Sequence, residues 1–108
     1  MRVSYRQAAS DDVVSQFRYY LVTLDLPDVA IRFRDGVRRT VESLRQHPLV
    51  GPRNRSDKPE LQNLRSWPVV GFEAIRIYYV LDQHQEVIHV IRVLHGKRDV
   101  EHILGSER

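Results

Sequence analysis

A chain of 108 residues without cysteine is long enough to bury one hydrophobic core, but it cannot form a disulfide or a thiolate metal site. Its N-terminus lacks the apolar run of a signal peptide, and no stretch approaches the roughly 20 apolar residues of a membrane span, so we expect one cytoplasmic domain over residues 1–108. The formal net charge is +3, and lysine occurs only at Lys58 and Lys97. Because the guanidinium group of arginine binds phosphate or carboxylate through two hydrogen-bond donors, we expect an anionic partner, either nucleic acid or an acidic protein segment.

The first quarter of the sequence predicts a short strand and an amphipathic helix. The strand occupies residues 2–5, and Ser10 then suits the N-cap of a helix whose first turn holds Asp11 and Asp12. Apolar residues follow at helical spacing in one stripe: Val14, Phe17, Leu21 and Leu24.

A second helix is predicted to run antiparallel to the first, after a tight turn at residues 25–27. Pro27 is well suited to a first helical turn, and the helix should stop at His47 and Pro48. Its apolar stripe consists of Ala30, Phe33, Val37, Val41 and Leu44.

The second half of the sequence predicts a sheet. Residues 49–60 are rich in Pro, Gly and Arg, which is typical of a loop. β-branched and aromatic residues then predict three strands, with a polar hairpin loop at 82–86 between the last two: 61–69, 74–81 and 87–94. Asp99 can cap a short final helix that ends at Gly105. We therefore predict an α+β domain, in which an N-terminal strand and a helical hairpin pack on a twisted antiparallel β-meander, with a short C-terminal helix.

Arg76 and Arg92 form the most informative pair of charged residues. If the hairpin loop is centred on His84, these two arginines lie directly opposite each other on one face of the sheet. Like charges in that position are unfavourable, so an anion should lie between them, either a phosphate or an acidic partner. The alternative is that a nearby carboxylate or backbone carbonyl groups satisfy both guanidinium groups.

Three further basic residues extend this pair into a candidate binding surface. Arg65 belongs to the preceding predicted strand, and Lys97 and Arg98 follow the last one. Such residues at the end of a sheet commonly form no more than a solvated rim, and the sequence leaves both interpretations open.

His95 is the candidate proton donor near a phosphodiester, because an imidazole titrates near neutrality. A structural histidine that closes the strand is the alternative. His95, Asp99 and His102 could share one helical face, but their spacing matches no standard zinc motif, and no other cofactor motif is present. We therefore expect neither a metal ion nor a cofactor.

Two segments of the second half resemble one protein family. Residues 64–73, LRSWPVVGFE, resemble the L-R-x-W-P-V-x-G-F-E signature of RelE/ParE superfamily toxins, and Ile77-Tyr78-Tyr79 follows at the expected place. Residues 92–99, RVLHGKRD, resemble the R-V-L-H-G-x-R-D ending of the ParE-like branch. The helical hairpin and the transition at residues 44–51 resemble the family as well, so the resemblance spans nearly the whole chain.

This resemblance implies the toxin of a type II toxin–antitoxin system, with the α+β fold predicted above. In such systems the toxin is held inactive by a cognate antitoxin, whose flexible tail folds around it and so forms an extensive interface. The complex often represses the shared operon. The resemblance therefore implies that this chain contacts operator DNA only through its antitoxin, and that no membrane is involved.

The family divides over its target. ParE-type members poison DNA gyrase without known chemistry of their own, whereas RelE-type members cleave ribosome-bound mRNA with basic side chains and often a C-terminal Tyr. Arg76 and Arg98 stand at positions similar to two of those basic residues, with His95 as the only candidate acid. This sequence has no counterpart of that C-terminal Tyr or of the strand that carries lysines in RelE. We therefore expect ParE-type gyrase inhibition, with the RelE-like endonuclease and a basic nucleic-acid-binding module as alternatives.

Overall fold

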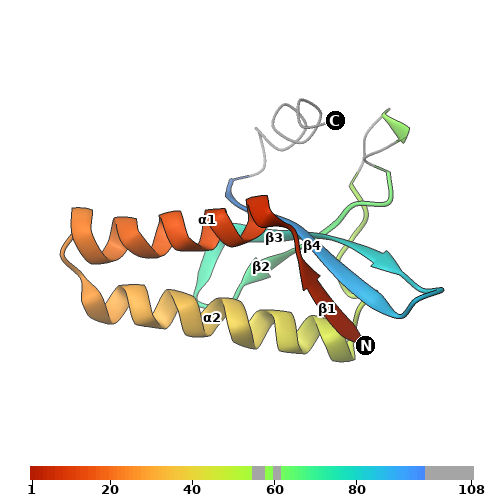
Figure 1. The fold of residues 1–108 in the computed structure, drawn as a ribbon, viewed down its shortest axis with the longest axis horizontal. Helices are drawn as coiled ribbons and strands as arrows, with labels where there is room; N and C mark the ends of the chain where they lie inside the picture. Colours follow the sequence, from red (N-terminus) through yellow and green to blue (C-terminus); the bar gives the residue numbers. More distant parts are fainter. Residues whose placement is uncertain (55–57, 60–61, 97–108) are drawn as a thin grey trace.

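The computed structural model describes residues 1–54, 58–59 and 62–96, and it confirms an α+β fold with two helices packed on a four-stranded sheet (Figure 1). The elements in chain order are β1 (Arg2–Tyr5), α1 (Gln7–Arg18), the π-helix η1 (Tyr19–Thr23), α2 (Pro27–Gln46), β2 (Arg65–Val69), β3 (Phe72–Asp82) and β4 (Val87–His95). The helix expected after Asp99 lies outside the described residues. In the part of the chain that is described, no helix has the length and apolarity of a membrane span.

The sheet has the strand order β1-β4-β3-β2. The pairs β2–β3 and β3–β4 are antiparallel, as the predicted meander requires, whereas β1 runs parallel to β4. The sheet as a whole is therefore mixed, because the chain crosses through the helical hairpin before it returns to form the meander. The two helices lie side by side over one face of this sheet (Figure 1).

Helix α2 confirms the sequence prediction at both ends and along its stripe. Pro27 is its first residue and His47 its C-cap. All five predicted stripe residues are buried in the core, so this helix supplies more fully buried apolar side chains than α1 does.

Helix α1 departs from the prediction. It begins at Gln7 and not after Ser10, because the carbonyl of Arg6 already accepts a hydrogen bond from the N–H of Ser10 (3.1 Å), while the N–H of Arg6 still donates to the carbonyl of Val90 in the sheet (2.9 Å). The predicted apolar stripe does not form the core-facing side of this helix: Val14 is 53% exposed, and Leu21 and Leu24 are exposed as well. The residues that pack on the core are Ala9, Val13 and Tyr20.

The predicted pairing of Arg76 with Arg92 is wrong by two residues. Arg76 lies opposite Leu94, and Arg92 lies opposite Tyr78. The turn is one residue shorter than expected, since Asp82 pairs with Val87, and a bulge at Ile91 shifts the register by one further residue. Hydrophobic patterning carries no signal for either feature.

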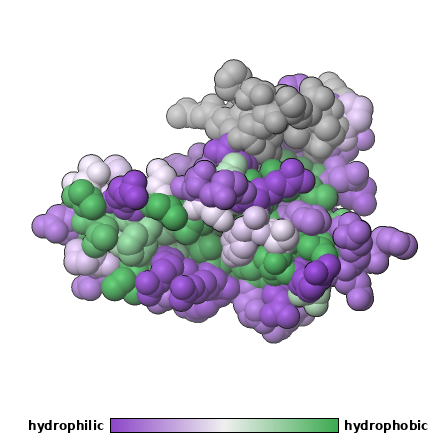
Figure 2. Space-filling model, viewed as in Figure 1, coloured by the Kyte–Doolittle hydropathy of each residue, from purple (hydrophilic) through white to green (hydrophobic). Residues whose placement is uncertain are grey.

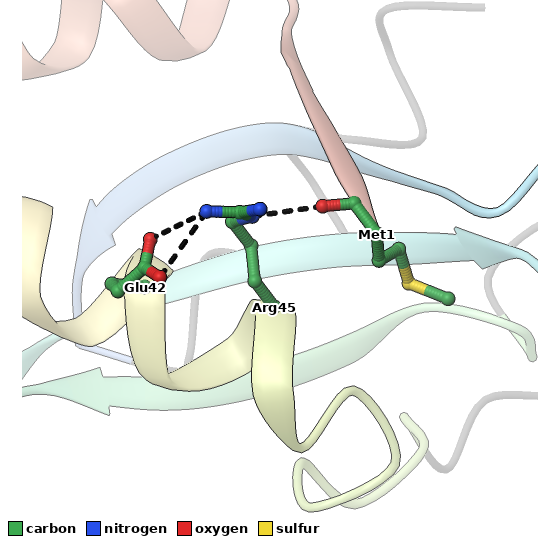
Figure 3. A network of polar contacts seen from close by, with 3 residues as sticks. All are labelled: Met1, Glu42 and Arg45. Atoms are coloured by element: carbon green, nitrogen blue, oxygen red, sulfur yellow. Dashed lines mark hydrogen bonds and ion pairs between the residues drawn. The ribbon is translucent and has the colours of Figure 1, made fainter.

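The outer edge of β1 is partly covered by the end of α2 (Figure 3). The Nε of Arg45 donates to the carbonyl oxygen of Met1 (2.8 Å), and its Nη1 donates to both carboxylate oxygens of Glu42 (2.9 and 3.2 Å). A charged side chain placed on a sheet edge discourages pairing with other strands.

Helix α2 approaches the β2–β3 turn closely at Gly36. A Cβ atom there would lie 2.8 Å from the carbonyl oxygen of Val70. Thr40 fixes the approach, because its Oγ1 donates to the carbonyl of Gly36 (2.7 Å) and accepts from the N–H of Val70 (3.0 Å).

We expect Gly36→Ala to lower the free energy of unfolding by about 1–3 kcal/mol, the usual cost of overpacking, even though alanine favours a helix by about 1 kcal/mol. Urea denaturation measures the change. Ser43→Ala, on the exposed face of the same helix, is the control and should shift stability by less than about 0.5 kcal/mol. Unchanged or increased stability of Gly36→Ala would show that the helix can move away from the turn at no cost.

Candidate functional site

Arg92 is held by Asp12, which reaches it from α1. Nε of Arg92 lies 2.7 Å from Oδ2 of Asp12, and Nη2 lies 2.9 Å from Oδ1, so the contact has two points. The backbone N–H of Val93 donates to the same Oδ2 (2.9 Å). The Arg92 and Asp12 side chains are only 15% and 14% exposed. The expected anion beside Arg92 is therefore present, and it is a carboxylate of the chain itself.

The other two predicted surface arginines that the structure describes are also bound within the chain. Arg76 donates from Nε and Nη2 to the Oγ of Ser66 (3.1 and 2.9 Å). Arg65 donates from Nη1 to the carbonyl of Gly51 (2.7 Å) and to that of Leu49 (3.3 Å), which ties the loop after α2 to the start of β2. Lys97 and Arg98 lie outside the described residues.

His95 and Arg76 lie on opposite faces of the sheet. His95 pairs with Ile75, whose side chain is buried in the core beneath the helices. Arg76 is the next residue of β3, and neighbouring residues of a strand point to opposite faces. The candidate acid and the candidate phosphate-binding arginine are therefore not brought together.

Two buried tyrosines support the structure around these residues. Burial raises the pKa of Tyr79, whose hydroxyl donates to the carbonyl of Pro48 (2.8 Å) and accepts from the N–H of Gly51 (3.0 Å). Burial also raises the pKa of Tyr78, although the charge of Arg76 acts against it. Both phenols stay protonated at neutral pH, so neither can act as a base.

No three metal-ligating side chains come together among residues 1–54, 58–59 and 62–96. Of the three residues considered for such a set from the sequence, only His95 is described, and it is exposed.

The structure forms a groove that sequence reasoning missed. It lies between the two helices, has a volume of about 340 Å³ and is lined by Tyr5, Ser10, Val13, Val14, Arg34, Val37 and Arg38. We call it the inter-helix groove. Its floor and walls are mostly apolar, and its α2 rim carries the two arginines. The sequence signal for it was Val14, the first residue of the predicted apolar stripe, which is exposed and lines the groove.

Apolar surface continues from this groove to the turn that joins the helices. The exposed side chains there are Tyr19, Leu21, Val22, Leu24 and Leu26, and hydrophobic surface gathers at this end of the hairpin, on the left of Figure 2. At the rim of the groove, the Nε of Arg34 is buried without a hydrogen-bond partner and lies 3.6 Å from Oδ1 of Asp35. An exposed apolar surface of this kind is typical of one that another molecule covers.

Comparisons with known proteins agree on one family. Residues 3–100 match the model of the ParE toxin of the type II toxin–antitoxin system parDE. No curated protein matches the sequence.

Among solved structures, the chromosomal ParDE toxin–antitoxin system of P. aeruginosa is similar with a TM-score of 0.67 and 18% identity, over 90% of this chain and 97% of that one. The YoeB/ParE toxin of Agrobacterium tumefaciens is similar with a TM-score of 0.61 and 13% identity, over 90% of this chain and 100% of that one. The RelBE2 toxin–antitoxin complex of Mycobacterium tuberculosis is similar with a TM-score of 0.53 and 23% identity, over 87% of this chain and 95% of that one. At these identities the structures show a common fold. The family match covers most of the sequence, so the chain belongs to the ParE toxins of type II toxin–antitoxin systems.

Proposed function

We propose that this toxin acts in the cytoplasm by binding DNA gyrase and not by cutting RNA. The observation that supports this most is the placement of His95 and Arg76 on opposite faces of the sheet. A general acid must lie within about 3 Å of the atom that it protonates, or reach it through one water. A phosphate held by Arg76 would be out of reach of His95.

The state of Arg92 supports the same proposal. An incoming phosphate would have to displace a carboxylate that already makes three hydrogen bonds at 2.7–2.9 Å. Membership of the ParE family supports gyrase as the target, because the resemblance described above links ParE-type members to gyrase. We propose Lys97, Arg98 and the rest of the C-terminal segment as the surface that meets the target, since the other predicted arginines already serve the fold.

We further propose that a cognate antitoxin neutralises this toxin by laying an amphipathic helix into the inter-helix groove. The similar structures from P. aeruginosa and M. tuberculosis are of toxin–antitoxin systems. A helix with an apolar face fits a groove floored by Val13, Val14 and Val37, and acidic residues on it would meet Arg34 and Arg38.

The target is tested with gyrase supercoiling and ribosome-dependent mRNA cleavage assays run side by side. We expect the purified protein to inhibit supercoiling and to leave mRNA intact. His95→Ala should inhibit equally well, because the change costs only about 1 kcal/mol of packing. Circular dichroism confirms that the variant is folded. Cleavage of ribosome-bound mRNA that disappears in the folded variant would instead identify an endonuclease with His95 as its acid.

The antitoxin site is tested by Val14→Asp, which places a charge in the groove at a position that is already 53% exposed, so the fold should persist. We expect the affinity for the antitoxin encoded beside this gene to fall at least about tenfold, or about 1.4 kcal/mol. Co-expression with that antitoxin should then no longer restore growth. Arg39→Glu, on an exposed part of α2 outside the groove, is the control. Equal affinity of Val14→Asp, Arg39→Glu and the unmodified protein would exclude the groove.

A further inference from the structure

A second hollow lies at the end of the sheet, where β2 begins and β3 turns into β4. Its volume is about 450 Å³, and its polar lining consists of Arg53, Asn63, Arg65, Asp82, Gln83 and His89. We call it the sheet-end pocket. It shares no lining residue with the inter-helix groove.

Two arginines are fixed directly opposite each other at this pocket. Arg53 and Arg65 form an antiparallel bridge. The flanking backbone keeps them in place, since the N–H of Asn54 donates to the carbonyl of Leu64 (2.6 Å) and that of Ser66 donates to the carbonyl of Pro52 (3.3 Å). Like charges directly opposite across a strand pair are destabilising. The backbone therefore imposes a repulsion that an anion between the side chains would relieve.

The donors around the pocket are largely unused. Arg65 makes its described hydrogen bonds through Nη1 alone, which leaves Nε and Nη2 for a ligand. The side chains of Arg53 and His89 make no hydrogen bond or ion pair with any described residue. The one carboxylate in the lining, Asp82, accepts from the N–H of Gln85 (3.0 Å). Positive charge and free donors therefore dominate the pocket.

We propose that the sheet-end pocket binds a phosphate group, carried either by a free nucleotide or by the backbone of a nucleic acid. Guanidinium groups match phosphate with two donors at once. A phosphate also offers oxygens in several directions, so Arg53, Arg65 and His89 can each donate to a different one. A carboxylate has only two coplanar oxygens and would leave donors unused.

The test is a titration of the full-length protein, followed by NMR of the backbone amides. Inorganic phosphate, a nucleoside 5′-monophosphate and a short single-stranded oligonucleotide are added in turn, at an ionic strength held constant with chloride. We expect all three to shift the amide signals of Gln83 and His89. Arg53→Gln should weaken inorganic phosphate binding about tenfold, the effect of losing one charge-assisted hydrogen bond.

The matched control is Arg39→Gln, which removes the same charge from α2, away from the pocket. It should change phosphate binding less than twofold. His89→Gln, which removes a second donor of the pocket, should also weaken phosphate binding. Oligonucleotide binding that exceeds mononucleotide binding and depends on Arg53 identifies a nucleic-acid backbone, whereas equal affinities identify a free nucleotide. No shift at Gln83 and His89, or equal weakening by Arg53→Gln and Arg39→Gln, overturns the proposal.

Discussion

The pairing of Asp12 with Arg92 is the constraint on which the arrangement of this toxin depends. It joins α1 to β4 across 80 residues of sequence, through two side-chain contacts and one backbone N–H, with both side chains largely buried. Removing either partner of such a pair leaves an unpaired charge in a poorly solvated place, which is strongly destabilising. The pair therefore fixes where the first helix sits on the sheet.

That position has two consequences. With Asp12 turned toward β4, Val14 on the other side of α1 is exposed and lines the inter-helix groove. Arg92, in turn, is occupied by a carboxylate of its own chain. One contact thus both exposes a surface suited to an amphipathic partner and removes a basic residue from any phosphate-binding cleft around β4.

The arginines of this protein divide by what they bind. Arg45, Arg65, Arg76 and Arg92 bind backbone carbonyls, a hydroxyl or carboxylates of the chain. Arg53 has no such partner among the described residues, and it faces another arginine across a backbone bridge. The expectation of an anion between two opposed arginines was therefore physically reasonable, but the opposed pair lies at the start of β2 and not between β3 and β4.

The sequence predicted the helices and strands better than it predicted which face of α1 is buried or how β3 and β4 are paired. The ends of helix α2 could be predicted because Pro27 begins it and His47 caps its C-terminus, and its predicted apolar stripe is buried throughout. The stripe of α1 could not be assigned, since helical spacing is the same for a core face and for a partner face. The β3–β4 register depended on a bulge at Ile91, which no hydrophobic pattern encodes.

The family signature proved to be largely structural. Gly71 has a positive φ of 83°, which the β2–β3 turn needs, and Leu64 and Val69 are buried. Its residues therefore identify the fold and leave the target to be inferred from other features. The pairing of Asp12 with Arg92 lay beyond any local pattern, because its partners come from opposite ends of the chain.

The central claim is that Arg92 serves the fold through Asp12. A double-mutant cycle of Asp12→Ala and Arg92→Met, followed by urea denaturation, tests it most directly. Each single change should lower the free energy of unfolding by about 3 kcal/mol. The double change should cost about as much as one of them, which gives a coupling energy above about 2 kcal/mol. Effects that add to within about 0.5 kcal/mol would contradict this account and return Arg92 to the set of residues available for a ligand.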